Sequence, residues 1–247
     1  MSTAAFGLAF ERVVGPGAVA RLVDSFTDNP VILLAGDQAS GKSTAARLIA
    51  HQFGGEAGST GAMVRARAAT LGMSFEVFTA HLRDDPDADV RHDHLAATAI
   101  AEGTVVAFES RLAGHLGAWL RQLGRRELHS VYLHCPPKER ALRVLERATS
   151  AAMRARAEAA VDDAESFEAV VRSLSDIAHP EIASVCGRLR VAAERDRHDR
   201  DRIRSLYGID YTDTSVFDTC VDTSATDPVA TVTTILDGWR CTSGGRS

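Results

Sequence analysis

The sequence predicts an α/β fold of three layers, in which helices cover both faces of a parallel sheet. Short, continuous apolar runs such as "VILLA" (31–35) and "HSVYLHC" (129–135) indicate strands that are buried on both faces. These runs alternate with longer segments of helical periodicity, as they do in parallel sheets. The chain has 247 residues and is 45% hydrophobic, which is enough for one core with a subdomain.

Elements of the first half follow from apolar runs and from glycine breaks. The segment "GAVARLVDSF" (17–26) predicts a short helix, and the rest of residues 1–30 gives no clear pattern. Gly54-Gly55 and Gly103 mark two helix ends, because glycine adopts the left-handed conformation that closes a helix. The expected strands are 31–35 and 104–110, and the expected helices are 42–53, 59–72, 74–82 and 87–102.

In the second half, helices are more frequent than strands. A buried apolar stripe at helical spacing is expected within 150–190, and Pro180 interrupts that region. The stripe consists of Phe167, Val170, Val171, Leu174 and Ile177. The expected strands are 129–135 and 217–223, and the expected helices are 113–123, 138–149, a charged helix over 182–206 and a closing helix over 227–239.

Composition excludes several classes of protein. The formal net charge is −5, with acids and bases interleaved, so we expect no nucleic-acid partner. No apolar stretch approaches the roughly 18 residues of a membrane span, and the start "MSTAAFGLAFERVVG" lacks the basic region of a signal peptide. Four widely separated cysteines favour a reducing compartment over a disulfide framework or a zinc site. We therefore expect a cytoplasmic protein without a membrane partner.

The segment "GDQASGKS" (36–43) matches the phosphate-binding loop pattern G-x-x-x-x-G-K-[ST]. The loop follows a predicted strand and opens a predicted helix, which is the context that this pattern requires. The helix start offers free N–H groups and a positive dipole end to phosphate. Lys42, one of only two lysines in the chain, can reach the β- and γ-phosphates of ATP, and the Ser43 hydroxyl can bind Mg²⁺.

We expect the loop to hold ATP through consecutive residues, namely Gly36, Gln38, Ala39, Ser40, Gly41, Lys42, Ser43 and Thr44. Asp37 is unusual there, because a carboxylate repels a polyphosphate. We expect its side chain to point outward; the alternative is contact with metal or substrate. GTP-binding switches, ATPases and small-molecule kinases all use this loop. A guanine-binding N-K-x-D pattern is absent, and Glu109, which ends "VVAFE", is a weak match to the acidic strand end of an ATPase.

Arginines in three segments could form a second anionic pocket for a phosphorylated acceptor. Arg65 lies in the helix after the loop helix, and Arg111 follows a strand's carboxyl end, where ligands of open parallel sheets bind. Arg195, Asp199 and Arg202 are spaced i, i+4 and i+7, and therefore share one helix face. The alternatives are surface arginines and a solvated face of i,i+4 ion pairs.

The order of these segments resembles the cytidylate kinases, including their archaeal-type branch, within the fold of the P-loop nucleoside monophosphate kinases. The similarity covers roughly residues 31–149 and 190–237. The segments that carry it are the loop, "TGAMVRARAATLGMS", "VVAFESRLAGHL", "VYLHCPPKERALRVLER" and "RDRHDRDRIRSLYGIDYTDTSVFDTCVDTS".

This resemblance implies a three-layer P-loop kinase with a helical lid or insertion, which moves the γ-phosphoryl group of Mg·ATP to CMP or dCMP. Lys42, Arg195 and Arg202 would be catalytic, and Ser43 would bind the metal. The acceptor would be bound by Gly61, Arg65, Arg111, Asp199 and, as a lid-edge arginine, Arg147. The partner is then a small nucleotide, and the protein a monomer or homodimer. The implied regions are an N-terminal extension (1–30), a core (31–149) with acceptor helices at about 56–102, an insertion and lid (150–206), and a closing strand and helix (207–240).

Several positions depart from the family pattern. Ala39 replaces the usual second glycine of the loop. Val64 stands where the family has a tyrosine, and Ser110 stands where it has a glycine. Residues 150–190 form a long helical insertion. If Val64 and Ser110 line the base pocket, the acceptor could be a modified cytidylate. Two further alternatives are a kinase of a non-nucleotide small molecule, such as an antibiotic or a biosynthetic intermediate, and a nucleotide-binding regulator without transfer activity.

Overall fold

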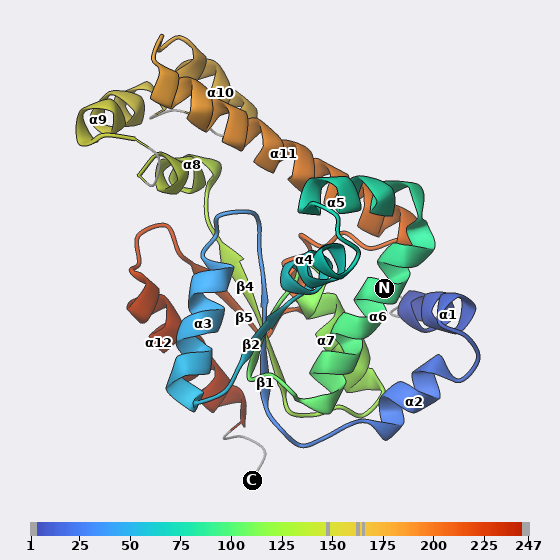
Figure 1. The fold of residues 1–247 in the computed structure, drawn as a ribbon. Coiled ribbons are helices and arrows are strands. Elements are labelled where there is room, and N and C mark those ends of the chain that lie inside the picture. Colours follow the sequence, from blue (N-terminus) through green and yellow to red (C-terminus); the bar gives the residue numbers. More distant parts are fainter. Residues whose placement is uncertain (1–3, 147–148, 162–163, 165, 244–247) are drawn as a thin grey trace.

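The computed structural model describes residues 4–146, 149–161, 164 and 166–243. Its centre is a five-stranded sheet in the order β2-β3-β1-β4-β5, and every pair in it is parallel. The predicted α/β class is therefore confirmed (Figure 1). The strands are β1 (Val31–Ala35), β2 (Ala57–Ser59), β3 (Ala107–Glu109), β4 (Leu128–His134) and β5 (Thr219–Asp222).

Helices cover both faces of the sheet, so the central strand is buried on both sides. On β1, Ile32 and Leu34 pack with α3 and α12, whereas Leu33 and Ala35 belong to the cluster on the opposite face. This alternation follows from the two-residue period of a strand. The helices of the two layers are α3 (Lys42–Phe53) and α12 (Pro228–Ser243) on one face, and α6 (Pro86–Glu102) and α7 (Ala113–Gln122) on the other.

Two elements that the sequence did not predict complete the body of the molecule. The helix α1 (Ala4–Val13) precedes the predicted α2 (Ala18–Asp24), and its Phe6 and Phe10 rings pack against Trp119 of α7. The edge strand β2 pairs in parallel with β3 through Ala57 and Ala107. It is three residues long and contains no β-branched residue, so its sequence carries no strand signal.

A group of helices projects beyond the carboxyl end of the sheet (Figure 1). We call it the projection; it consists of α8 (Pro137–Glu146), α9 (Ala151–Ala160), α10 (Phe167–Ser175) and the first half of α11 (Pro180–Tyr207). It has a hydrophobic cluster of its own, which contains the predicted apolar stripe of α10. Pro180 does not break a helix but begins α11, where its missing N–H costs nothing.

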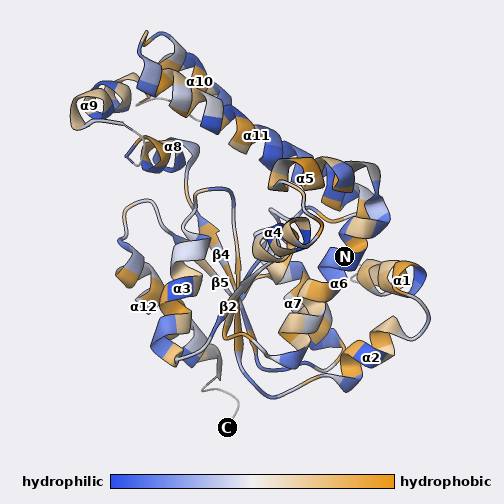
Figure 2. Cartoon of the chain, viewed as in Figure 1, coloured by the Kyte–Doolittle hydropathy of each residue, from blue (hydrophilic) through white to orange (hydrophobic). Residues whose placement is uncertain are grey.

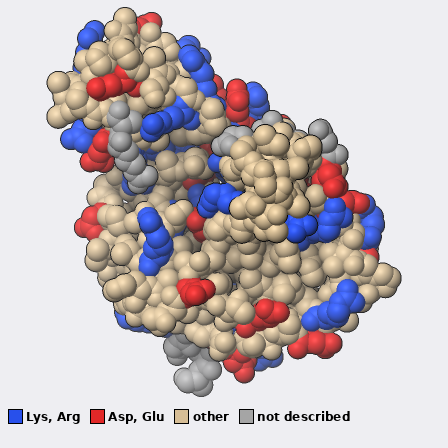
Figure 3. All heavy atoms as spheres, in the orientation of Figure 1, with Lys and Arg blue, Asp and Glu red and all other residues tan. Residues whose placement is uncertain are grey.

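The long helix α11 joins the projection to the acceptor helices predicted from the sequence. Figure 2 shows its middle part as hydrophilic. This part lies near α5 (Phe75–Asp84), which follows α4 (Thr60–Thr70) (Figure 1). On the face drawn in Figure 3, acidic and basic side chains are interspersed, and basic side chains lie where the projection meets the body. Among the described residues, no helix has the length and apolar character needed to cross a membrane.

Candidate active site

The loop between β1 and α3 has the backbone of a phosphate cradle. Gly36 and Gly41 have φ values of 138° and 99°, which strongly favour glycine. A Cβ atom on Gly36 would also lie 2.4 Å from the carbonyl oxygen of Leu133, so that position has no room for a side chain. Gly41 precedes α3, whose first N–H groups have no intrahelical acceptor and remain available for an anion.

Ala39 occupies the position where the resemblance expects a second glycine, and it keeps a glycine-like backbone. Its φ is 64°, and it is the one described residue other than glycine with a positive φ. A left-handed alanine costs about 1–2 kcal/mol. The Arg143 guanidinium donates to the Ala39 carbonyl oxygen (3.2 Å), which helps to hold the loop in this conformation. The backbone at Ala39 therefore has the left-handed conformation that a glycine adopts readily.

Side chains from other elements engage the carbonyl groups of the loop. Arg140 donates to the Gln38 oxygen (3.2 Å), and Thr223, which follows β5 and is buried, donates to the Ser40 oxygen (3.0 Å). These carbonyl oxygens therefore have partners outside the loop. Neither Arg140 nor Thr223 was predicted. The signal available was that Thr223 ends a predicted strand and that Arg140 lies in the first turn of the predicted helix that follows another.

Lys42 closes the loop, and Ser43 faces an acid. The Lys42 ammonium donates to the Asp37 carbonyl oxygen (2.6 Å). Burial, and then the nearby positive charge of Arg111, lowers the pKa of Lys42 to about 8. The Ser43 hydroxyl lies 2.8 Å from both carboxylate oxygens of Glu109. The register of β1 and β3 pairs Leu34 with Glu109, and this explains why the end of β3 lies beside the loop.

The pair of Ser43 and Glu109 fits a magnesium ion bound together with a nucleotide. Mg²⁺ prefers oxygen ligands and is usually held by one or two protein groups plus phosphate oxygens and water. Among the described residues, no cluster of three or more His, Cys, Asp or Glu could hold a metal by itself. Sequence reasoning gave Glu109 little weight, although it ends a strand beside the loop. The hydroxyl and the carboxylate are thus the groups available for a metal that arrives with phosphate.

The expectation that Asp37 points outward is wrong. Its Oδ2 lies 3.5 Å from the Arg140 guanidinium, and its Oδ1 is buried without a hydrogen-bond partner among the described residues. Arg140 itself is 7% exposed and stacks on the Phe167 ring of the projection at 4.2 Å. The charge of this acid is therefore balanced by an arginine, Arg140, that was not predicted from the sequence.

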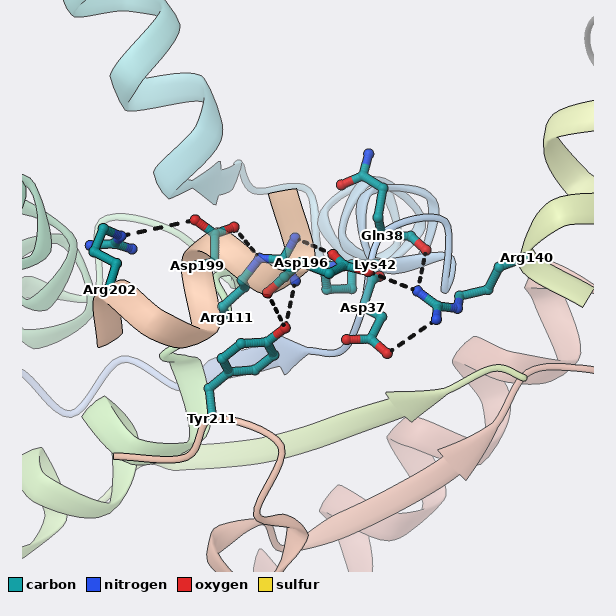
Figure 4. Close-up of polar contacts among 9 residues, drawn as sticks. All are labelled: Asp37, Gln38, Lys42, Arg111, Arg140, Asp196, Asp199, Arg202 and Tyr211. Carbon is teal, nitrogen blue, oxygen red and sulfur yellow. Dashed lines mark hydrogen bonds and ion pairs between the residues drawn. The ribbon is translucent and has the colours of Figure 1, made fainter. Parts of the chain in front are cut away.

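Arginines and aspartates alternate in a row that starts beside the loop (Figure 4). We call Arg140, Asp196, Arg111, Asp199 and Arg202 the ionic row. Asp196 lies 3.1 Å from Arg140 and 2.6 Å from Arg111, and Arg111 lies 2.6 Å from Asp199. Burial opposes the charge of Arg111, but Asp199 and Asp196 outweigh it and raise the pKa of the guanidinium. Asp196, which was not predicted, thus links two arginines from different elements.

The far end of the ionic row lies against α6. Arg202 is 3.9 Å from Asp199, 3.4 Å from Asp89 and 3.7 Å from Asp93. Its contacts are thus with acids, and Figure 4 draws it at the opposite end of the row from Lys42 and Arg140. The interpretation of this helix face as a solvated surface does not hold, because Arg202 and Asp199 are both less than one third exposed.

Arg65 and Arg195 lie together, although 130 positions separate them in the chain. Their guanidinium carbons are 5.8 Å and 5.0 Å from the centroid of the Phe75 ring. A Cβ atom built on Gly61, one turn before Arg65, would lie 3.5 Å from that guanidinium, which is an ordinary van der Waals contact. The structure therefore brings together two of the predicted arginines on one aromatic ring.

Two other residues singled out in the sequence, Val64 and Ser110, lie elsewhere. Val64 is buried in a small apolar cluster with Phe78 of α5, and Ser110 is buried and accepts a hydrogen bond from the Leu112 amide (3.2 Å). Both side chains thus serve local packing or a turn. Arg147 lies outside the described residues.

Comparison with known proteins agrees with this architecture. The family model described as "AAA domain" matches residues 32–167. A solved structure of an uncharacterized protein from Eubacterium ventriosum superposes with a TM-score of 0.51, covering 84% of this chain and 96% of that one. The two share 11% of their sequence, so this likeness concerns the fold alone.

Relatives of known name extend over nearly the whole molecule. The cytidylate kinase of Pyrobaculum aerophilum is 34% identical over 213 residues, which is 86% of this chain and 94% of that protein. The cytidylate kinase of Pyrobaculum islandicum is 30% identical over 78% of this chain and 84% of its own length. The cytidylate kinase of Ignicoccus hospitalis is 27% identical over 83% of this chain and 96% of its own length. With this identity and coverage, the chain belongs to the cytidylate kinase family.

Proposed function

We propose that this protein transfers the γ-phosphoryl group of Mg·ATP to the phosphate of CMP or dCMP, yielding ADP and CDP or dCDP. The observation that carries the proposal is the ionic row, which begins at a phosphate-binding loop and ends at the acceptor helices. A kinase of phosphorylated acceptors needs cations on both sides of the moving group. The names of the relatives point to the same acceptor.

On the donor side, the loop and the start of α3 would bind the phosphates of ATP. Lys42 would leave the Asp37 carbonyl oxygen and bind the β- and γ-phosphates. Ser43 and Glu109 would hold Mg²⁺, which neutralises charge on the phosphates when it is bound. Lys42 would exchange the Asp37 oxygen for phosphate oxygens, whereas the Ser43 hydroxyl and the Glu109 carboxylate would offer their oxygens to the metal.

On the acceptor side, Arg65 and Arg195 would bind the phosphate of the monophosphate, with Arg111 between them and the loop. Arg111 is paired with Asp196 and Asp199, so an incoming phosphate would compete with carboxylates that already neutralise the guanidinium. Catalysis then rests on positioning and on charge stabilisation, without a covalent intermediate.

Free thiols at all four cysteines fit our further proposal that the protein works in the reducing cytoplasm.

ATP binding is expected to depend on pH through Lys42. Because the pKa of Lys42 is lowered to about 8, the ammonium is present below that pH and is lost above it. ATP prefers the ammonium, so the Kd for Mg·ATP should be constant near pH 7 and rise by up to roughly tenfold per unit above pH 8. Calorimetric titration from pH 6.5 to 9.5 measures this. The Lys42→Arg variant keeps its charge over this range, so its Kd for Mg·ATP should be higher than that of the wild type but should not rise with pH. A wild-type Kd that stays constant up to pH 9.5 would contradict the assignment of Lys42 to ATP binding.

Replacing Arg65 by alanine separates phosphorylated from neutral acceptors. If Arg65 binds the acceptor phosphate, the KM for CMP should rise about 100-fold, corresponding to roughly 2–3 kcal/mol for a charge-assisted hydrogen bond. The affinity for ATP should stay within about twofold, since the loop is untouched. Arg67→Ala, on the same exposed helix, is the matched control and should leave both unchanged. An unchanged KM in Arg65→Ala would indicate an acceptor without phosphate.

The acceptor itself is tested by ADP release from Mg·ATP in the presence of CMP, dCMP, UMP, AMP or GMP. Strong stimulation by CMP or dCMP supports the proposal. Equal, weak release with all five would mean that the acceptor is another small molecule. Binding of ATP with no release under any condition would favour a regulator without transfer activity.

A further inference from the structure

Asp37 is the only acidic residue of the phosphate-binding loop from Gly36 to Ser43, and the proposed reaction gives it no role. Its side chain is 25% exposed, and its Oδ1 atom is buried without a hydrogen-bond partner among the described residues. A carboxylate in this loop repels a polyphosphate, and a poorly satisfied carboxylate is costly to bury. Asp37 therefore lowers the affinity of the loop for ATP, and its contact with Arg140 indicates what it contributes.

Arg140 contacts the loop at two successive residues. It lies in the first turn of α8, where the projection begins, and its guanidinium is directed toward the loop (Figure 4). One terminal nitrogen is 3.5 Å from the Asp37 carboxylate, and the other is 3.2 Å from the Gln38 carbonyl oxygen. Because the carbonyl group carries no net charge, Asp37 is the charged group of the loop that holds Arg140 there.

Arg140 also contacts α10 and α11. Its guanidinium stacks on the Phe167 ring of α10 at 4.2 Å and lies 3.1 Å from the Asp196 carboxylate of α11. Phe167 belongs to the hydrophobic cluster of the projection, and Asp196 lies 2.6 Å from Arg111. The side chain of Arg140 is 7% exposed, so it has little room to move independently of these neighbours. A displacement of Arg140 would therefore reach both the projection and Arg111.

Two carboxylates on different elements attract Arg140 in different directions. Asp37 attracts the guanidinium toward the loop, and Asp196 attracts it toward α11, at 3.5 Å and 3.1 Å. Such attraction is strong where water is largely excluded. If the charge of Asp37 were removed, Asp196 would be the carboxylate still in contact, and we expect Arg140 to move toward α11 and away from the Gln38 oxygen. The position of Arg140 thus depends on Asp37.

We propose that Asp37 is a positioning residue for phosphoryl transfer, which holds Arg140 at the loop and so keeps the ionic row aligned with the phosphates of ATP. This inference rests on the proposed function. Asp37 acts through Arg140 and does not itself need to touch either nucleotide. A misplacement of about 1 Å can lower the rate of an enzyme roughly 100-fold, so a small shift of Arg140 is sufficient. The same acid therefore weakens ATP binding and speeds the transfer.

The proposal predicts that Asp37→Asn changes ATP affinity and turnover in opposite directions. Asparagine keeps the size of the side chain and removes the charge that repels the polyphosphate, so the Kd for Mg·ATP should fall by at least about threefold. Because Arg140 loses its charged partner in the loop, kcat with CMP should fall by at least about tenfold. A loop that is merely damaged would bind ATP more weakly and would not show this split.

A second variant tests whether Asp37 acts through Arg140. In Arg140→Gln the charge of Asp37 is no longer balanced, so the Kd for Mg·ATP should rise while kcat falls. The double variant should have the kcat of Arg140→Gln alone, because residues that act through one contact are not additive. Glu139→Gln, at the neighbouring acid on α8, is the matched control and should leave Kd and kcat within about twofold of wild type.

The experiment measures three quantities on the full chain: the Kd for Mg·ATP by calorimetry, kcat with CMP, and the Mg²⁺ concentration that gives half-maximal rate. Thermal unfolding checks that each variant is folded, and if Arg140→Gln does not fold, the split in Asp37→Asn decides alone. A lower Kd together with a lower kcat in Asp37→Asn, at an unchanged Mg²⁺ requirement, supports the proposal.

Three results would overturn the role of Asp37 while leaving the proposed function in place. They are a kcat of Asp37→Asn within twofold of wild type, a fall in kcat accompanied by weaker ATP binding, and a raised Mg²⁺ requirement, which would make Asp37 a metal ligand. Additive losses of kcat in the double variant would likewise contradict action through Arg140. Absence of turnover by wild type with CMP contradicts the proposed function itself, and this inference with it.

Discussion

Replacing Lys42 by alanine is expected to lower turnover by about 10³-fold or more while the protein stays folded. Lys42 is the cation that closes the phosphate loop, and its ammonium reaches the Asp37 carbonyl oxygen across it. Loss of one group that stabilises transition-state charge lowers the rate roughly 10²–10³-fold. We expect the upper end of that range for Lys42, because the transferred phosphoryl group carries a full charge. In free energy this is about 4 kcal/mol.

The fold should tolerate the change, because burial disfavours the charged form of Lys42. Steady-state ADP release and thermal unfolding, measured on the same preparations, separate the two effects. Lys138, the other lysine of the chain, lies on α8, and Lys138→Ala is the natural control, with activity near that of wild type. Turnover near wild type in Lys42→Ala would show that the loop does not serve phosphoryl transfer.

Replacing Arg111 by alanine is expected to lower the free energy of unfolding by about 3 kcal/mol and to remove most activity. Its guanidinium is 14% exposed and contacts Asp196 and Asp199 at 2.6 Å each. Breaking a buried ion pair leaves an uncompensated charge and costs about 3–5 kcal/mol. Each aspartate keeps a second arginine, Arg140 or Arg202, so the lower end of that range applies.

Chemical denaturation measures this loss, and an exposed ion pair provides the comparison. Arg91 and Asp85 are 3.0 Å apart, but both are about half exposed, so Arg91→Ala should cost less than about 1 kcal/mol. If Arg111→Ala costs no more than Arg91→Ala, the ionic row does not hold α11 against the body. A double-mutant cycle with Asp199→Asn should show a coupling energy of at least about 1 kcal/mol between the two residues.

The sequence was most informative where a local pattern determines structure. The loop from Gly36 to Ser43 combines glycine spacing, a lysine and a hydroxyl, and the predicted strand and helix around it are those observed. Apolar runs placed β1 and β4, and glycines placed the ends of α3 and α6. Spacing on one helix also predicted that Arg195, Asp199 and Arg202 share a face, but it did not predict the residues of other elements that they contact.

The sequence was least informative where a residue acquires its role from a distant element. Glu109 is significant because the strand register places it beside Ser43, and Asp196 because α11 crosses between Arg140 and Arg111. In a chain rich in interleaved charges, such residues look like any surface acid. The strand β2 likewise forms through pairing rather than through local propensity, whereas α1 carries a local signal, with Phe6, Ala9 and Phe10 at helical spacing, that the prediction passed over.

We expect the γ-phosphoryl group to move from the loop to the phosphate of a cytidylate. Incubation of the protein with ATP labelled in its γ-phosphate, Mg²⁺ and CMP, followed by separation of the products, measures this transfer. The expected result is label in CDP, in amounts equal to the ADP formed, and no CDP with Lys42→Ala. Label that appears only as inorganic phosphate, or that stays in ATP whether or not CMP is present, would contradict the claim.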